Sequence, residues 1–208
     1  MNTMGIFSAL LLCVSNLFYP AVETVEPKTI PMKTVQTETV QTEMRSGATS
    51  HDQTDETNWI GKSAPEISEG KWINSKPLKL SELRGKVVLL EFWTFGCYNC
   101  RNTLPQMNAW YKKFSAPNFN SNLQMIGIHT PEFSREKNFE SLGRETALLE
   151  IKYPVVTDND NKTWNTYNQQ YWPVVYLIDK KGVIRYAQIG EGRYAETEAM
   201  IETLLKEN

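Results

Sequence analysis

The sequence predicts an α/β fold in which a mixed sheet carries helices on both faces. Two short apolar runs, residues 86–93 and 123–129, are separated by a segment with helical periodicity. Two further strand-like runs joined by a turn span residues 174–189, and a helical segment follows them. Strands that alternate with helices and then end in a hairpin and a helix are typical of a sheet covered on both sides.

The first apolar run, KVVLLEFW, contains β-branched residues and a single acid, as expected of a strand buried on both faces of a sheet. Residues 94–96 interrupt the run, and a helix is expected from about Cys97 to Phe114. The apolar residues of this helix recur at helical spacing, at Leu104, Met107, Tyr111 and Phe114. Pro105 lies inside the helix and is expected to kink it.

The rest of the chain continues the alternation. The expected elements are a second buried strand at residues 123–129, a polar exposed helix at 134–150, a short strand at 155–156, a short helix at 161–170, two strands at 174–178 and 183–189 joined by a turn, and a last helix at 193–206. A right-handed crossover places the first two strands side by side and parallel, whereas the last two pair antiparallel. Active sites in such sheets lie beyond the carboxyl ends of the strands, which is where Cys97 falls.

Composition excludes one broad class of function. The chain has 208 residues, a formal net charge of -2 and a pI of about 5.8. It therefore has no broad positive field of the kind that holds nucleic acid, and we expect no nucleic-acid partner.

The N-terminal part is expected to lie outside the folded domain. Residues 5–22 are almost free of charge and are typical of a secretory signal or a membrane anchor, with a buried core helix as the alternative. Cys13 is a poor lipidation site because the bulky Leu12 precedes it. The segment after it repeats the unit TVQTE, has no aromatic residue and holds too few apolar side chains to fold. The expected parts are a signal peptide or anchor at 1–22, a disordered linker at 23–58 and a folded domain at 59–208.

This organisation predicts a location outside the cytoplasm, in the periplasm or cell envelope. If the first segment is not cleaved, it would attach the protein to a membrane, and the linker would hold the domain away from the surface.

Two of the three cysteines lie in the predicted domain, spaced as CYNC at Cys97 and Cys100. A CxxC pair forms half of a structural zinc site or a redox pair. Structural zinc needs four ligands, and the only histidines are His51, in the predicted linker, and His129. A dithiol that cycles to a disulfide needs nothing else. The leading interpretation is therefore a redox-active Cys97–Cys100 disulfide, with no metal and no other cofactor.

The expected chemistry is thiol–disulfide exchange, in which a thiolate attacks. The helix N-terminus should lower the pKa of Cys97, because unpaired N–H groups and the helix dipole favour negative charge there. Cys100 lies one turn further along the helix and is expected to be the buried, resolving thiol.

Other residues are candidates for the same site. Glu91, the single acid of the first strand, would have a raised pKa if it were buried under the cysteines, and it could then exchange a proton with Cys100; an outward-facing charge is the alternative. His129 ends the second strand, where it either lines the site or has a structural role. Trp172 and Pro173 precede a strand. With a cis peptide bond they would form a platform on which a substrate peptide pairs like an added strand.

These residues resemble the active-site segment of thioredoxins. In EFWTFGCYNCRNTLP, a strand that ends in Phe-Trp is followed by the CxxC pair and by Pro105. The long stretch before Trp172 and Pro173 is similar to that of the TlpA/ResA branch of extracytoplasmic thioredoxins. The segments GIHTPEF, YWPVVYLIDKKGVIRY and GEGRY resemble the thioredoxin-like domain of DipZ-type proteins. The resemblance implies a thioredoxin fold with an insertion before the cis-proline strand.

The resemblance also implies a membrane-linked oxidoreductase that exchanges disulfides with protein substrates, and we expect it to act as a reductase. It implies that Cys97 is the nucleophile, Cys100 the resolving cysteine, Pro173 the cis-proline and Glu91 the buried acid. Gly96 departs from the pattern, because a Trp commonly precedes the first cysteine. Tyr98 and Asn99 also depart from the usual pair between the cysteines. DipZ-type proteins carry a membrane electron-transfer domain, which these residues do not contain, so a separate membrane protein is the expected electron donor.

Two other functions remain open on the same fold. Thr94, three residues before Cys97, is shared with thiol peroxidases, but those enzymes have a proline where this chain has Leu90. A copper chaperone would combine the two cysteines with a distal histidine, and His129 falls early in the sequence for that role. The direction of electron flow depends on relative reduction potentials, so the reductase assignment depends on the resemblance alone.

Overall fold

The computed structural model describes residues 58–115 and 122–207, which belong to one unit of the chain, Ala48–Asn208. The predicted signal segment and all but the last residue of the predicted linker lie outside these described residues. The elements in chain order are β1 (Trp72–Ile73), η2 (Leu80–Leu83), β2 (Val87–Trp93), α1 (Tyr98–Trp110), η3 (Tyr111–Ser115), β3 (Leu123–His129), η4 (Ser134–Lys137), α2 (Phe139–Leu148), β4 (Val155–Thr157), α3 (Lys162–Thr166), β5 (Val174–Ile178), β6 (Ile184–Ile189) and α4 (Tyr194–Lys206). Within the described ranges, no helix has the length and apolar character that a membrane span requires.

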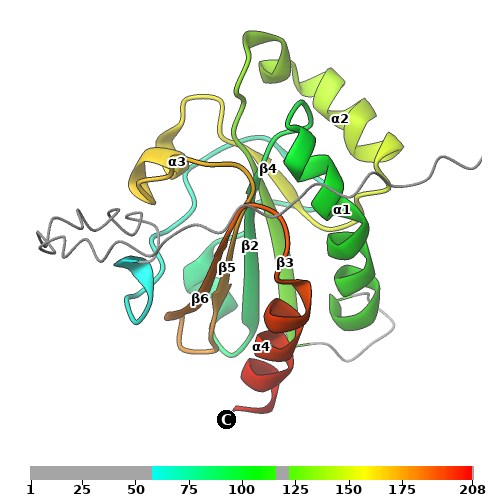
Figure 1. Ribbon diagram of the computed structural model, residues 1–208. Coiled ribbons are helices and arrows are strands. Elements are labelled where there is room, and N and C mark those ends of the chain that lie inside the picture. The colour runs from blue at the N-terminus through cyan, green and yellow to red at the C-terminus, as the bar shows by residue number, and fades with distance from the viewer. Residues whose placement is uncertain (1–57, 116–121, 208) are drawn as a thin grey trace, which may run out of the picture. The chain divides into compact units, whose positions relative to one another are not determined.

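One mixed sheet of six strands forms the centre of the fold, in the order β1-β4-β3-β2-β5-β6 (Figure 1). β2 pairs with β3 in parallel over its full length, so Trp93 and His129 end at the same level. β5 runs antiparallel to β2 and starts with Val174 opposite Phe92, and β6 pairs antiparallel with β5. The predicted α/β fold, with its parallel pair and hairpin, is confirmed. The carboxyl ends of β2 and β3 and the beginning of β5 therefore meet at one edge of the sheet.

The residues of β2 alternate between two hydrophobic layers, and all of them are buried. Val87, Leu89 and Trp93 pack in the layer that contains the apolar residues of α1, α2 and α4. Val88, Leu90 and Phe92 pack in the opposite layer, with η2 and α3. Removing such side chains from water contributes about 1.5–3 kcal/mol each, which explains why an apolar run forms the central strand. Glu91 has the parity of Leu89 and Trp93, so it faces the α1 layer.

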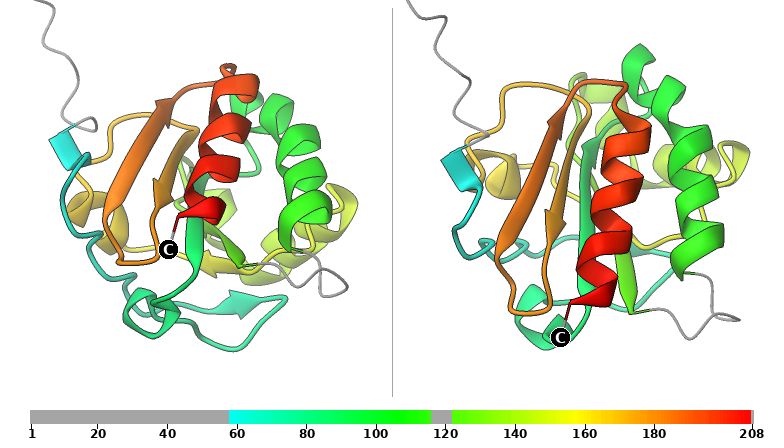
Figure 2. Two further views of the ribbon diagram at one scale, coloured as in Figure 1. Left: turned by 90° about the horizontal axis from the view of Figure 1, so that it is seen from below. Right: turned by 60° about the horizontal axis from the view of Figure 1, so that its bottom comes forward.

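Two helices lie side by side over the face to which Glu91 points. Figure 2 shows α4, in red, next to α1, in green, on one side of the sheet. The Trp110 indole N–H in α1 donates to the Glu198 carboxylate in α4 at 2.8 Å, and Lys113 pairs with the same carboxylate. These contacts fix the C-terminal end of α1 against α4.

The segment before β2 contains structure that the sequence did not predict. β1 adds an antiparallel edge strand beside β4, and Leu80 and Leu83 of η2 are buried in the α3 layer. The Glu66 carboxylate accepts hydrogen bonds from the N–H groups of Leu80, at 2.6 Å, and Ser81, at 3.1 Å. These elements are too short to show a hydrophobic period, because only their tertiary contacts stabilise them.

Several helices begin or end at other residues than the sequence predicts. The helix expected at residues 134–150 is two elements, η4 and α2, and the helix expected at 161–170 is only the short α3. Cys97 does not lie in the first turn of α1 but is its N-cap residue, and the helix ends at Trp110, where η3 continues as a π turn. The strands expected at 123–129 and 174–178 are found with these same bounds.

Candidate active site

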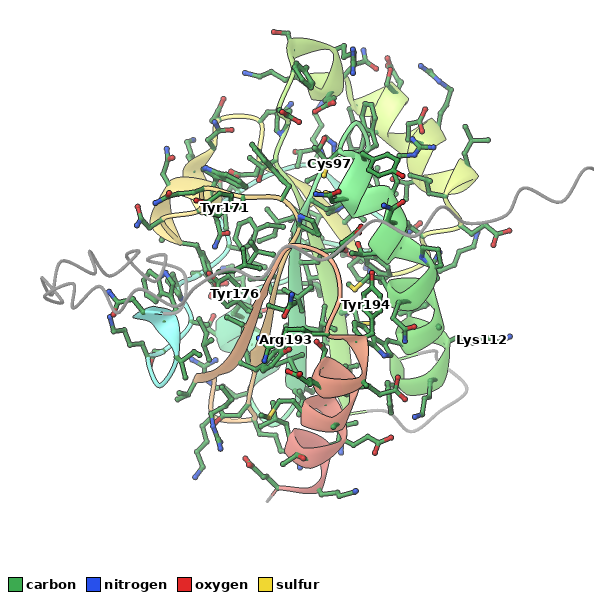
Figure 3. All side chains as sticks on the ribbon, viewed as in Figure 1. Cys97, Lys112, Tyr171, Tyr176, Arg193 and Tyr194 are labelled. Carbon is green, nitrogen blue, oxygen red and sulfur yellow. The ribbon has the colours of Figure 1, made fainter. Side chains whose placement is uncertain are left out.

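The CxxC pair lies at the carboxyl edge of the sheet, where β2 leads into α1. Figure 3 shows Cys97 at the beginning of α1, at the same end of the sheet as Tyr171. Cys97 is partly exposed, whereas Cys100 is fully buried in the first turn, and both are thiols in this structure. The Cys100 N–H donates to the Cys97 sulfur at 3.2 Å. The structure thus brings the two sulfurs together, with only one of them accessible.

The pKa values of the two thiols shift in opposite directions. The hydrogen bond from the Cys100 thiol lowers the pKa of Cys97 to about 7, and the N–H groups of Cys100 and Asn99 act in the same direction against the effect of burial. Burial raises the pKa of Cys100, and its hydrogen bond to Cys97 and the charge of Glu91 raise it further. The sequence predicted a lowered Cys97 pKa from the helix N-terminus alone, but the largest contribution comes from the partner thiol. At neutral pH, Cys97 is the thiol of this pair that ionises, and the thiolate is the attacking species.

Glu91 is fully buried in β2 and faces the layer that contains Cys100. Its Oε2 accepts a hydrogen bond from the Tyr153 hydroxyl at 2.9 Å, and its Oε1 has no hydrogen-bond partner among the described residues. Burial raises the pKa of Glu91 to about 8; the Tyr153 hydrogen bond opposes this shift and the charge of Cys97 adds to it. The alternative interpretation of Glu91 as an outward-facing charge is wrong, because the sheet and α1 enclose it.

Glycine is required opposite Glu91 because two aromatic rings fill the space around the acid. Gly127 of β3 is paired with Glu91 in the sheet register. A Cβ at Gly127 would lie 2.8 Å from the Trp93 indole nitrogen and 3.2 Å from Cε2 of Tyr153. Sequence reasoning did not identify Tyr153, which precedes β4 and shows no signal other than being aromatic.

Trp172 and Pro173 lie at the same edge of the sheet, directly before β5, and the peptide bond between them is cis. The Trp172 indole stacks on Trp164 with ring centroids 4.0 Å apart and donates to the Thr130 carbonyl at 3.1 Å. The Pro173 carbonyl accepts from the Gly190 N–H at 2.8 Å. These contacts fix the expected platform relative to both α3 and the end of β3.

His129 lies beneath the loop that precedes Cys97. It is fully buried, its ring stacks on Phe95 with centroids 5.3 Å apart, and its Nε2 lies 3.1 Å from the Thr94 hydroxyl. Burial lowers the pKa of His129 to about 4, so the ring is neutral at neutral pH. The structure therefore places His129 under residues 94–95, in contact with both of them.

Known proteins share this architecture. A crystal structure of a thiol-disulfide isomerase from Corynebacterium glutamicum matches with a TM-score of 0.61 and 28% sequence identity, and the match covers 70% of this chain and 98% of that chain. With a CxxC pair at the start of α1, the chain belongs to the class of thioredoxin-fold proteins that includes thiol-disulfide oxidoreductases. It belongs to the AhpC/TSA family, whose model matches residues 60–187.

Curated relatives refine this placement. Protein DipZ of Mycobacterium tuberculosis is 41% identical over 139 residues, which are 65% of this chain and 19% of DipZ. The chain thus spans about a fifth of the length of that relative. Thiol-disulfide oxidoreductase ResA of Bacillus cereus is 30% identical over 146 residues, which are 70% of this chain and 78% of ResA. These relatives support the expected place in the TlpA/ResA-like branch of the fold.

Proposed function

We propose that this chain reduces disulfides in protein substrates outside the cytoplasm, with Cys97 as the attacking thiol and Cys100 as the resolving thiol. The observation that carries the proposal is the contrast between the two: Cys97 is accessible with a pKa of about 7, and Cys100 is buried with a raised pKa. A disulfide between them is the only redox group that the reaction requires.

The first step is attack by the Cys97 thiolate on a substrate disulfide. The substrate S–S bond breaks, a mixed disulfide forms at Cys97, and the released substrate thiolate takes up a proton. Cys100 then loses its proton, and its sulfur attacks the Cys97 sulfur. The Cys97–Cys100 disulfide forms and the second substrate thiol leaves, so the substrate gains two electrons and two protons.

Glu91 is proposed to accept the proton of Cys100. Once the Cys97 thiolate has been consumed, its charge no longer raises the pKa of Glu91. The acid is then ionised to a greater extent at the moment when Cys100 must lose its proton. Trp172 and Pro173 are proposed to hold the substrate backbone beside Cys97 in an extended conformation.

A separate membrane protein is proposed to return two electrons to the Cys97–Cys100 disulfide. The apolar segment at residues 5–22 and the polar stretch after it support an extracytoplasmic location, with the membrane as the attachment site if the segment is retained. The resemblance to DipZ-type proteins supports a membrane source of electrons.

Trapping of substrates tests this division of roles. Cys100→Ser removes the resolving thiol, and it should therefore accumulate mixed disulfides with proteins, which a reducing agent releases. Cys97→Ser is the matched control and should trap few proteins, because Cys100 is buried. Equal trapping by the two variants would overturn the assignment of roles. A Cys97–Cys100 potential more oxidising than that of glutathione would overturn the reductase direction but leave the oxidoreductase chemistry intact.

A further inference from the structure

A second buried acid, Glu136, lies close to the active-site loop. It belongs to η4 and is 1% exposed. Its Oε2 accepts hydrogen bonds from the Thr94 hydroxyl at 2.7 Å, from the Glu132 N–H at 2.8 Å and from the Phe133 N–H at 3.2 Å. A buried carboxyl group is costly unless donors compensate for its lost hydration. These donors compensate for Oε2, whereas the buried Oε1 has no hydrogen-bond partner among the described residues. Glu136 therefore links the segment after β3 to the residue that follows β2.

The same carboxyl group packs against the backbone immediately before Cys97. A Cβ at Gly96 would lie 1.8 Å from Oε1 of Glu136, closer than any non-bonded contact allows. Gly96 does not have a positive φ, so its backbone conformation does not require glycine. A side chain at this position would therefore have to displace the end of the Glu136 side chain.

The loop is held from its other side by His129. The Thr94 hydroxyl has a single proton, which it donates to Glu136, so the hydrogen bond between Thr94 and His129 must be donated by Nε2 of the histidine. Phe95 stacks on the same imidazole ring. Thr94 and Phe95 are thus fixed by contacts with β3 and η4, and Gly96 lies against the Glu136 carboxyl group.

We propose that Glu136 is a positioning residue for Cys97: it holds residues 94–96 so that the Cys97 sulfur stays in reach of the Cys100 N–H and thiol. The proposal rests on Cys97 being the attacking thiol. Two observations support it: three donors bind Oε2 of Glu136, and Oε1 of Glu136 packs closely against Gly96. Glu136 contacts the loop and not the reacting sulfurs, so it acts through residues 94–96.

Positioning and charge predict opposite effects of Glu136 on the Cys97 thiolate. A negative charge near Cys97 disfavours the thiolate, as the charge of Glu132 does, whereas a fixed loop favours it by directing donors at the sulfur. Glu91 of β2 also interacts electrostatically with Cys97. The pKa of Cys97 can therefore distinguish a substitution that removes only the charge of Glu136 from one that removes its hydrogen bonds.

The experiment compares Glu136→Ala with Glu136→Gln by the pH dependence of alkylation, with mass spectrometry to identify the modified cysteine. Glu136→Gln keeps an oxygen for the three donors, so the pKa of Cys97 should stay the same or fall. Glu136→Ala frees the loop, and the pKa should exceed that of the Gln variant by about one unit, which leaves roughly fivefold less thiolate near pH 7. Glu132→Gln is the charge control and should lower the pKa without slowing exchange.

Equal Cys97 pKa values and exchange rates in the Ala and Gln variants would overturn the positioning role. If Glu136→Ala does not fold cooperatively, Gly96→Ala provides the same comparison, because its Cβ displaces the carboxyl group without removing it. It should shift the pKa of Cys97 upward, and an unchanged pKa in a folded Gly96→Ala protein would also overturn the proposal. Alkylation of Cys100 in preference to Cys97 in the unmodified chain would instead overturn the proposed roles of the two thiols.

Discussion

Cys97 and Cys100 have the same side chain and lie three residues apart, yet their acidities differ. The Cys97 thiol is accessible and has a pKa of about 7, whereas the pKa of the Cys100 thiol is raised far above neutral pH. Burial and donated hydrogen bonds cause the difference. Glu91 shows the same principle: an exposed glutamate is ionised at neutral pH, but burial raises the pKa of this one to about 8. Single residues at this site thus acquire their chemistry from where the fold places them.

The raised pKa of Glu91 predicts a pH-dependent stability that Glu91→Gln should remove. The folded protein binds this proton more tightly than the unfolded chain does, because its pKa is about 8 rather than 4.5. The stabilising contribution is present below the lower value and is lost as the pH rises toward 8. The Gln variant should lack this loss, which between pH 5 and 8 is on the order of 3–4 kcal/mol. Urea unfolding of the reduced proteins at about pH 5, 6.5 and 8 measures it.

The same substitution should slow the resolving step by about a hundredfold, because no carboxylate accepts the Cys100 proton. Tyr153→Phe is the matched control, since it removes the hydrogen bond to Glu91 but keeps the acid. Resolution should persist in that variant with its pH dependence moved upward. Identical resolving rates for the Gln variant and the unmodified chain at every pH would remove Glu91 from the mechanism.

At the scale of elements, a capping residue decides where Glu136 lies. Asn138 ends η4 and begins α2, and its Oδ1 accepts a hydrogen bond from the Ser141 N–H at 2.7 Å. The backbone of Asn138 is extended, with φ -74° and ψ 116°, so the chain changes direction between η4 and α2. The break therefore allows η4 to turn its acid toward Thr94 while α2 packs Leu142 in the layer that contains α1.

Asn138→Ala should lower the free energy of unfolding by about 1 kcal/mol, because one N–H in the first turn of α2 loses its acceptor. Asn138→Ser supplies another side-chain oxygen and should recover most of the loss. Denaturant unfolding of both variants measures the effect. A Ser variant as unstable as the Ala variant would show that the hydrogen bond is not the cause.

At the scale of the whole molecule, one edge of the sheet gathers groups that are far apart in the sequence. Trp93 and His129 end paired strands, Cys97 follows the first of them, and Pro173 precedes β5 on the other side of β2. The order of the strands brings these residues together, since β2 lies between β3 and β5. The dithiol, Trp172 and Pro173 thus lie at one edge of the sheet, and Glu91 lies on the face next to that edge.

The N-terminal segment of the chain also leads to a prediction about where the protein is located in the cell. A reporter enzyme fused after Ser50, and active only outside the cytoplasm, should be active, because the apolar segment at residues 5–22 is expected to direct export. The control fusion lacks residues 1–22 and should be inactive. Activity of a reporter that works only in the cytoplasm, fused at the same position, would contradict the predicted location.

Local patterns in the sequence were sufficient for the central strands and the dithiol. A continuous apolar run specifies a strand that must be buried on both faces, and CxxC after such a strand specifies two thiols one turn apart. Sequence alone thus determined the bounds of β3 and β5, the order of the main elements, and the candidates Cys97, Cys100, Glu91, Trp172 and Pro173. Each of these signals is carried by residues close together in the chain.

Only the tertiary structure decided which polar residues lie close to the pair and to the loop before it. Glu136 lies in a polar stretch and Tyr153 in a short loop, where nothing in the pattern separates a buried side chain from an exposed one. The partners of these residues, Thr94 and Glu91, are more than forty positions away, at sequence separations of 42 and 62. Contacts between residues so far apart in the sequence depend on strand order and helix packing, so local periodicity does not predict them.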